Sequence, residues 1–440
     1  MNKAIAIFML GLLSLPGWAQ DEYPRSLHYR EVVELAEQRN LTLASDAKEV
    51  DMARSRLDQA VGLRRPTLGI DSIYNLQEQS LIKGVLPLPG IPGGPGSSQL
   101  MLNSLGLQVP IYTGGRLESA IHQNRALIEV NQQNLQRSRE EVAYQAKQLF
   151  LQAVLARENS EVAQQTLVEA NETLRQSEAR KKAGTGTKFD VMQAKVAVSN
   201  AEQQVISTQT AYDNAQATLA ILLHFPVDTR FELAESLLAP QVDLEPVVST
   251  DLKSLTVVAL DQRPELASLR AQLRANHEAE NVAQSGIRPQ VSMDLSYAFV
   301  GAPSSLQGGW SILALLSVPI YDGGVTHAKV GELKHREEQL ALNTQRQVDQ
   351  VALDVKQALL SLQNADSRVA TATRQVDEAR EAVRLARVRF LAGAGTSLEL
   401  VSAQASYASA QYALADARYG QIAGRAQLNL ALGLAPGRAS

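Results

Sequence analysis

The chain of 440 residues contains no cysteine, so disulfides, cysteine-bound metals, cysteine nucleophiles and a lipid on an N-terminal cysteine are all excluded. Aromatic residues make up only 5% of the sequence, which is typical of long, closely packed helices rather than of one large globular core. Beyond the N-terminal segment, no stretch approaches the roughly eighteen consecutive apolar residues that a transmembrane helix needs. The formal net charge of −4 is mildly acidic, which argues against nucleic acid as a partner.

Motifs that would carry catalysis are also missing. The segment Gly184-Thr-Gly-Thr-Lys188 lacks the Gly-Lys-Ser/Thr ending of a phosphate-binding loop and lies between two predicted helices. Leu102-Asn-Ser-Leu-Gly106 lacks the first glycine of a nucleophile elbow. The six histidines include no His-Glu-x-x-His frame for a metal. We therefore expect no enzymatic activity, no cofactor and no metal site.

The first nineteen residues have the pattern of a secretory signal peptide. Lys3 supplies the positive charge, an apolar run follows from Ala4 to Leu15, and Ala19 ends the segment with a small residue before Gln20. The apolar run is too short to span a membrane as a helix. We predict that residues 1–19 are removed on export, and an uncleaved anchor is the alternative.

The rest of the sequence is internally duplicated. Val109-Pro-Ile-Tyr-Thr-Gly-Gly115 recurs as Val318-Pro-Ile-Tyr-Asp-Gly-Gly324, and Ala183-Gly-Thr-Gly-Thr187 recurs as Ala392-Gly-Ala-Gly-Thr396. Both pairs keep the same offset of 209 residues, so the segment between the two motifs has no net insertion. Self-similarity at a fixed offset indicates two copies of one structural unit.

A third motif pair marks an insertion in the first copy. Arg65-Pro66 matches Arg288-Pro289 at an offset of 223, and the Pro/Gly-rich run from Leu86 to Ser98 is the candidate for the additional residues, as an exposed loop. The predicted boundaries are a first repeat at 20–232, a linker at 233–250, a second repeat at 251–434 and a tail at 435–440.

Each repeat contains two segments of alternating polarity, at about 66–77 and 101–110 and at about 290–299 and 310–319. Within the third segment, apolar side chains occupy the odd positions from Val291 to Phe299, and the even positions are mainly polar. Such alternation predicts β-strands that are apolar toward lipid and polar toward a wet lumen. It is equally expected of an ordinary antiparallel sheet packed on helices. Four strands cannot close a barrel, whereas three chains would supply twelve.

The segments after each strand pair predict very long helices, at about 116–182 and 325–391. The first contains neither proline nor glycine, and apolar residues recur every seven positions in both, which is typical of coiled coils. Shorter helices are predicted at about 27–63, 188–223 and 397–434. We expect two short helices to pack lengthwise on each long one, and a soluble coiled-coil rod is the alternative.

From Leu27 to Leu434 the chain resembles the outer membrane efflux protein family, the TolC-like channels. The resemblance rests on the duplication, the Arg-Pro pairs, the two Val-Pro-Ile-Tyr-x-Gly-Gly motifs and the two Ala-Gly-x-Gly-Thr turns. It implies an α+β membrane protein that forms a homotrimer in outer-membrane lipid. Four strands of each chain would contribute to a twelve-stranded outer-membrane β-barrel, and the antiparallel coiled-coil helices would form a periplasmic α-barrel.

The resemblance also implies partners and contact residues. Channels of this family dock through their periplasmic tips onto a periplasmic adaptor protein, which joins them to an inner-membrane transporter. The two Ala-Gly-x-Gly-Thr turns map to the tips. The candidate adaptor-contact residues are Gly184, Thr185, Gly186, Thr187, Gly393, Ala394, Gly395 and Thr396.

Family channels narrow near this end through rings of acidic side chains. Asp190 and Glu399 are equivalent at the offset of 209, and in a trimer each would occur three times around the axis, favouring cations. Each carboxylate also lies in the first turn of a helix, where it favours the helix dipole without any pore. Some relatives have a second carboxylate at the position of Ser402 and a basic residue at that of Gly395, so a salt-bridged gate is not expected here.

The leading hypothesis is a passive trimeric exit duct of a tripartite efflux pump or type I secretion system, in the Gram-negative outer membrane. A soluble periplasmic coiled-coil scaffold is the first alternative, and an envelope enzyme with no recognisable site is the second. The polar face of the predicted strands favours the duct, because a scaffold needs no wet lumen.

Overall fold

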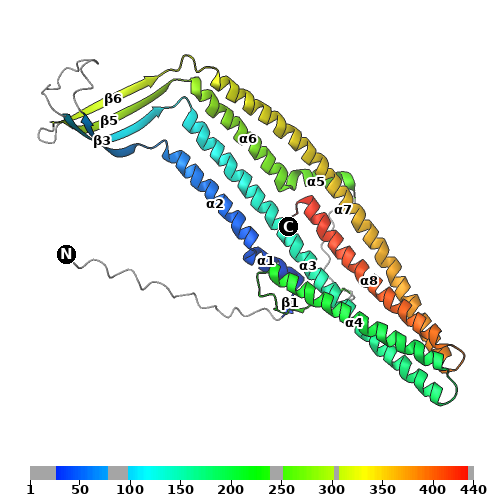
Figure 1. Cartoon of the computed structure of the whole chain (residues 1–440). Coiled ribbons are helices and arrows are strands. Elements are labelled where there is room, and N and C mark those ends of the chain that lie inside the picture. The colour runs from blue at the N-terminus through cyan, green and yellow to red at the C-terminus, as the bar shows by residue number, and fades with distance from the viewer. Residues whose placement is uncertain (1–25, 78–97, 238–250, 302–306, 435–440) are drawn as a thin grey trace, which may run out of the picture. The chain divides into compact units, whose positions relative to one another are not determined.

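The computed structural model describes residues 26–77, 98–237, 251–301 and 307–434 (Figure 1). The predicted signal peptide and C-terminal tail lie outside the described residues, as do nearly all of the Pro/Gly-rich loop and most of the predicted linker. The elements in chain order are β1 (Ser26–Leu27), α1 (Tyr29–Arg39), α2 (Leu41–Gly62), β2 (Thr67–Gln77), β3 (Ser98–Tyr112), α3 (Arg116–Lys182), α4 (Lys188–Leu222), β4 (Glu232–Leu233), α5 (Leu252–Gln262), α6 (Pro264–Gln284), the 3₁₀ turn η2 (Ser285–Ile287), β5 (Gln290–Gly301), β6 (Gln307–Ser317), α7 (Val325–Leu391) and α8 (Ser397–Leu432).

The chain folds into two compact units, and both sequence repeats contribute to each of them. The strand unit contains the four long strands with the adjoining helices, from Leu41–Val142, Val247–Leu360 and the residues from Gln427 onward. The hairpin unit contains the two helical hairpins, from the residues up to Asn40, Ala143–Pro246 and Ser361–Ala426. The boundary between the units cuts through α3, α7 and α8, so the repeats are units of sequence, not separate compact bodies.

One antiparallel sheet, in the order β2-β3-β5-β6, lies in the strand unit. The two hairpins of this sheet have the same register, because Thr67 faces Gln108 in the first repeat and their equivalents Gln290 and Ser317 face each other in the second. The β3–β5 pair joins the repeats. The strand duplication predicted from sequence is therefore repeated residue by residue in the backbone pairing.

The apolar side chains of this sheet are largely exposed, and in β5 the apolar face is the more exposed one. In β5 the side chains of Met293, Leu295, Tyr297 and Phe299 are exposed, while the polar residues between them are less so. None of the four strands has a buried side chain among those described. This is the reverse of a sheet packed on helices, so the sequence-based alternative of an ordinary packed sheet is wrong.

Each strand pair turns into its long helix through a glycine pair. Gly114 and Gly115 have φ values of +66° and +89°, and Gly323 and Gly324 have +69° and +83°, a region that only glycine enters at little cost. The residue before each pair caps the helix that follows. The Thr113 hydroxyl accepts a hydrogen bond from the amide of Leu117 at 3.3 Å, and the carboxylate of its equivalent Asp322 accepts two amides.

The long helices α3 and α7 have 67 residues each. In the hairpin unit they run antiparallel to α4 and α8 and contact them through small apolar side chains (Figure 1). One such cluster joins Ala372 and Val376 of α7 to Ala410, Leu414 and Ala417 of α8. No helix in the described part of the chain is long and apolar enough to cross a membrane.

The helix predicted at about 27–63 is in fact two helices, and that prediction was wrong. Helix α1 ends at Arg39, Asn40 takes an extended conformation with ψ 124°, and α2 begins at Leu41. The second repeat breaks at Arg263 in the same way, with ψ 123°. Here the cause is Pro264, because a residue before proline is pushed out of the helical region. The two-residue parallel pair β1–β4 was not predicted.

Candidate functional site

The first candidate site is the turn between α3 and α4. The amides of Thr185 and Gly186 both donate to the Arg180 carbonyl, at 3.0 and 3.1 Å, which closes the C-terminus of α3. Gly184 has a φ of +78°, where a side chain would be strained. A Cβ on Gly186 would lie 3.0 Å from the Cβ of Arg180. The two glycines therefore serve different purposes, one conformational and the other steric.

The turn between α7 and α8 repeats this geometry. The amides of Ala394 and Gly395 donate to the Arg389 carbonyl at 2.9 and 3.0 Å, and Gly393 has a φ of +75°. Six of the eight predicted contact residues are exposed, and only Gly186 and Gly395 are half-buried. Most of the turn surface is thus accessible to a partner in the single chain.

Asp190 is held in a capping box with Thr187. The Thr187 hydroxyl accepts the Asp190 amide at 3.1 Å, and the Asp190 carboxylate accepts the Thr187 amide at 3.0 Å and its hydroxyl at 2.7 Å. These hydrogen bonds, above all the one from the hydroxyl, lower the pKa of the Asp190 carboxyl below its ordinary value. The carboxylate is ionised at neutral pH, and it is hydrogen-bonded to Thr187, the residue that caps its own helix.

Glu399 has the same position in the second turn and a different partner. Its amide donates to the Thr396 hydroxyl at 3.2 Å, but its carboxylate forms an ion pair with Arg389 at 3.4 Å. The two side chains remain 47% and 59% exposed, so solvent screens the pair. Glu399 therefore presents a partly neutralised carboxylate at the surface of the turn.

The structure joins the two turns through residues that the sequence reasoning did not single out. The guanidinium of Arg180, in α3, donates to the Phe390 carbonyl of α7 at 2.7 Å and lies 4.6 Å from the centroid of the Phe390 ring. Phe390 is 1% exposed. We call this contact the Arg180–Phe390 clasp. Nearby, the buried hydroxyl of Ser397 donates to the Asp190 carbonyl at 3.4 Å, so the two candidate turns form one surface.

A signal for the clasp was present in the sequence. Arg180 and Arg389 are equivalent at the offset of 209, and each guanidinium also reaches the carbonyl of its own turn, Thr185 for the first and Ala394 for the second. An arginine near the end of both long helices therefore indicated that the two turns share this contact. The ring partner Phe390 could not be inferred this way, because its equivalent is Lys181.

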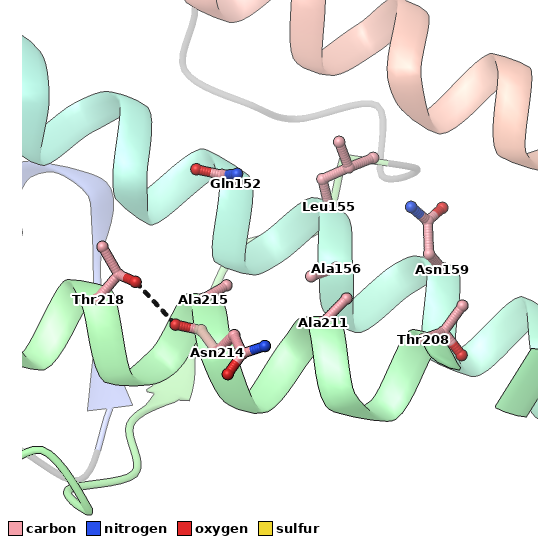
Figure 2. A pocket seen from close by; sticks show the side chains of 9 residues that line it. All are labelled: Gln152, Leu155, Ala156, Asn159, Thr208, Ala211, Asn214, Ala215 and Thr218. Atoms are coloured by element: carbon pink, nitrogen blue, oxygen red, sulfur yellow. Dashed lines mark hydrogen bonds between the residues drawn. The ribbon is translucent and has the colours of Figure 1, made fainter. Parts of the chain in front are cut away.

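A shallow groove of about 300 Å³ lies between α3 and α4 in the hairpin unit. Figure 2 shows Ala211 and Ala215 of α4 facing Ala156 of α3, with the Thr218 hydroxyl donating to the carbonyl of Asn214. No acidic or basic side chain lines the groove, so it offers no acid–base pair. Within the described residues, no cluster of three or more His, Asp or Glu side chains could hold a metal ion.

Comparison with known proteins identifies the family. A sequence profile described as "Outer membrane efflux protein" matches residues 32–223 and 255–434. The pyoverdine export outer membrane protein OpmQ of Pseudomonas putida is 27% identical over 289 residues, which cover 64% of this chain and 60% of that protein. The chain therefore matches less than two thirds of this relative's length. The alkaline protease secretion protein AprF of Pseudomonas aeruginosa is 23% identical over 342 residues, 76% of this chain and 69% of AprF.

The fold has close counterparts among solved structures. The outer membrane channel CmeC of Campylobacter jejuni superposes with a TM-score of 0.81 at 16% identity, covering 94% of this chain and 87% of CmeC. At this level of identity the likeness concerns the fold alone. Strands, long helices and paired hairpins are thus arranged as in a known channel.

Proposed function

The chain belongs to the outer membrane efflux protein family, and we propose that three copies of it form a passive exit duct. As a member of that family it is a protein of the Gram-negative outer membrane that extends into the periplasm. In the proposed duct, strands from three chains form one twelve-stranded wall in outer-membrane lipid. The helical hairpins line a tube through the periplasm, and substrates pass through without chemical change.

The observation that carries this proposal is the four-stranded sheet. Its edge strands β2 and β6 have no partner among the described residues, and its apolar face is exposed. In lipid, each unpaired backbone group costs several kcal/mol, so an open edge cannot remain. Four strands are too few to close on themselves. With three copies, β2 of one chain can pair with β6 of the next, so that no edge strand remains unpaired. The exposed apolar face then lies toward lipid.

The joined turns of the hairpin unit are the proposed contact surface for a periplasmic adaptor. Six of the eight candidate residues from Gly184 to Thr187 and from Gly393 to Thr396 are exposed, and the Arg180–Phe390 clasp holds both turns in one arrangement. A surface fixed before binding loses little conformational entropy on association. The adaptor would in turn connect the duct to an inner-membrane transporter.

Glu399 is the stronger of the two candidates for an acidic ring that narrows the pore. Its half-exposed carboxylate reaches away from its own helix cap toward Arg389. The Asp190 carboxylate is bound by Thr187 instead. Three copies of Glu399 around an axis would favour cations, and the three paired Arg389 residues would weaken that preference.

The transported substrate is expected to be chosen by the pump and not by the duct. The relatives are named for pyoverdine export and for alkaline protease secretion, which are cargoes of very different size. A tube that does not select its cargo suits both, and we therefore assign the chain to a tripartite efflux pump or a type I secretion system.

The first experiment is to measure the native mass and the membrane fraction of the exported protein after detergent extraction. A trimer recovered from the outer membrane only with detergent is the expected result. A monomer or dimer released without detergent would contradict the duct and support a periplasmic coiled-coil scaffold. A washed outer-membrane preparation with a resident porin as marker controls for loosely attached periplasmic protein.

A further inference from the structure

The apolar face of the first strand hairpin, β2–β3, contains two polar residues that hydrogen-bond to each other. The Ser72 hydroxyl donates to the side-chain oxygen of Asn103 at 2.6 Å, and the two residues face each other in the strand register. We call them the polar pair. The neighbouring cross-strand pairs on this face are apolar or aromatic, namely Leu68 with Leu107, Ile70 with Leu105, and Tyr74 with Met101. The polar pair therefore interrupts an otherwise apolar surface.

The second strand hairpin, β5–β6, has no such interruption at the equivalent level. Its residues at the equivalent positions, at offsets of 223 and 209, are Leu295 and Ile312, which also face each other. This hairpin has a hydrogen-bonded pair of its own, Ser296 with Ser311 at 2.8 Å, but on the opposite, polar face of the sheet. A hairpin of the same register thus forms with apolar residues at this level, so the register does not require the polar pair.

The side chain of Asn103 can still donate hydrogen bonds. Its oxygen accepts the Ser72 hydroxyl, and its amide nitrogen has no acceptor among the described residues. Ser72 is exposed and Asn103 is half-buried, so a second molecule can reach the pair. On a face that lies in lipid, no water is present to accept these donors, and leaving them unbonded is unfavourable. A lipid with a carbonyl or hydroxyl oxygen at this depth would supply the missing acceptor.

Exposed tyrosines indicate the depth of the polar pair. Tyr74 and its equivalent Tyr297 are exposed toward the end of the strands that lies away from the helices. Tyr112 and its equivalent Tyr321 are exposed where the strands meet the helices. Between the levels of Tyr74 and Tyr112, β5 contributes residues 291–301 to the pairing, which is about 33 Å along a strand and about 25 Å across a membrane at a tilt of about 40°. Aromatic rows at this separation are typical of the two edges of an outer-membrane apolar band.

The polar pair lies two residues from Tyr74 along the strand, about 5 Å inside the outer tyrosine row at the same rise and tilt. The helices continue from the opposite end of the strands, so this row belongs to the outer leaflet. We propose that the polar pair binds an outer-leaflet glycolipid whose acyl chains are amide-linked and hydroxylated, as in lipid A. This inference rests on the proposed duct, because it requires strands in outer-membrane lipid. The amide carbonyl and the hydroxyl of such a chain lie just below the sugar headgroup, and both can accept a hydrogen bond from the Asn103 amide.

The strand beside the polar pair supplies an apolar surface for the acyl chain. Asn103 faces Phe299 of β5, and the Phe299 and Tyr297 rings meet edge-to-face with their centroids 5.1 Å apart. Both rings lie close to Gly308, where a Cβ would be 2.7 Å from the Tyr297 hydroxyl and 3.1 Å from the Phe299 ring. Phe299 is 45% exposed. An acyl chain that accepts the amide donor through its carbonyl or hydroxyl can therefore extend over an aromatic surface.

Native mass spectrometry of the detergent-extracted trimer tests this proposal. Hexa-acylated lipid A is the added probe, with an equal amount of phosphatidylethanolamine as competitor, and the unmodified chain should bind up to three lipid A molecules per trimer. The variant S72L/N103I has the residues of the second hairpin at this level and should bind lipid A about tenfold more weakly, as expected for the loss of two hydrogen bonds in lipid. The control S296A/S311A removes the hydrogen-bonded pair of the polar face and should bind as the unmodified chain does.

The single variants separate the two side chains of the polar pair. Asn103→Leu should weaken binding as much as the double variant, and Ser72→Ala should weaken it less, because the amide donor remains. Equal binding by S72L/N103I and the unmodified chain, or an equal loss in S296A/S311A, would reject the site.

The same spectra separate this proposal from the proposed function. Retention of phosphatidylethanolamine in place of lipid A would reject the glycolipid. A trimer that binds no lipid A would reject the site but leave the duct, and a monomer would reject both.

Discussion

Replacing Arg180 with alanine is predicted to loosen the joined turns without unfolding the helices. The change removes a hydrogen bond from a charged donor to the Phe390 carbonyl at 2.7 Å, worth about 1.5–3 kcal/mol. It also removes a cation–ring contact at 4.6 Å, worth about 0.5–1 kcal/mol in a partly exposed site. Allowing for solvent access to the guanidinium, we expect a local loss of about 2 kcal/mol.

Hydrogen exchange at the second turn measures this loss. The amides of Ala394 and Gly395 donate to the Arg389 carbonyl, and local opening of the turn exposes them. A loss of about 2 kcal/mol in the opening free energy corresponds to roughly 30-fold faster exchange. The melting temperature of the whole chain should change little, because the long helices keep their own contacts.

Arg389→Ala is the matched control, because Arg389 is the repeat equivalent of Arg180. Its ion pair with Glu399 is half exposed, and such pairs contribute about 0–1 kcal/mol. Exchange at the turns should therefore accelerate much less. If Arg389→Ala accelerated exchange as much as Arg180→Ala, or if neither did, the clasp would not be what holds the turns together.

Three further predictions follow from the turn geometry. Gly184→Ala should destabilise the first turn by about 1–2 kcal/mol because its φ is +78°, whereas Gly62→Ala, with open space around it, should leave the melting temperature unchanged; equal losses would contradict this. The Asp190 pKa is lowered in the folded chain, so its contribution to stability is present above its ordinary pKa and is lost as the pH falls through the lowered value; Asp190→Asn should lack this acid-dependent loss in a pH series of unfolding curves. In planar bilayers, Glu399→Gln should lower the cation preference of the proposed pore and Arg389→Gln should raise it, and changes of the same sign would exclude a pore position for the pair.

Local chemistry explains why so much of the fold could be predicted from the sequence. A glycine pair after Val-Pro-Ile-Tyr-x is informative because both glycines take positive φ in each repeat, and few other residues tolerate that backbone. The strand predictions succeeded because period-2 alternation reflects side-chain direction, which the backbone fixes. The equal register of the two hairpins shows that the motif offsets of 209 and 223 carried geometric information.

The features that were missed depend on contacts between distant segments. The break at Asn40 has no proline or glycine beside it, unlike the break before Pro264, so periodicity alone continued the helix. The pairing of β1 with β4 involves two residues on each strand, separated by about two hundred positions, which leaves no local pattern. The Arg180–Phe390 clasp requires both hairpins to be in place.

Asp190 and Glu399 show why equivalence in sequence does not give equivalence in function. Both stand three residues after the turn threonine, and both amides donate to that threonine's hydroxyl. The shorter aspartate folds back onto the Thr187 amide, whereas the glutamate carboxylate forms an ion pair with Arg389. One methylene thus separates a carboxylate bound by its own helix from one that is available at the surface. Of the two predicted ring positions, Glu399 is the one whose carboxylate is not engaged by its own turn threonine.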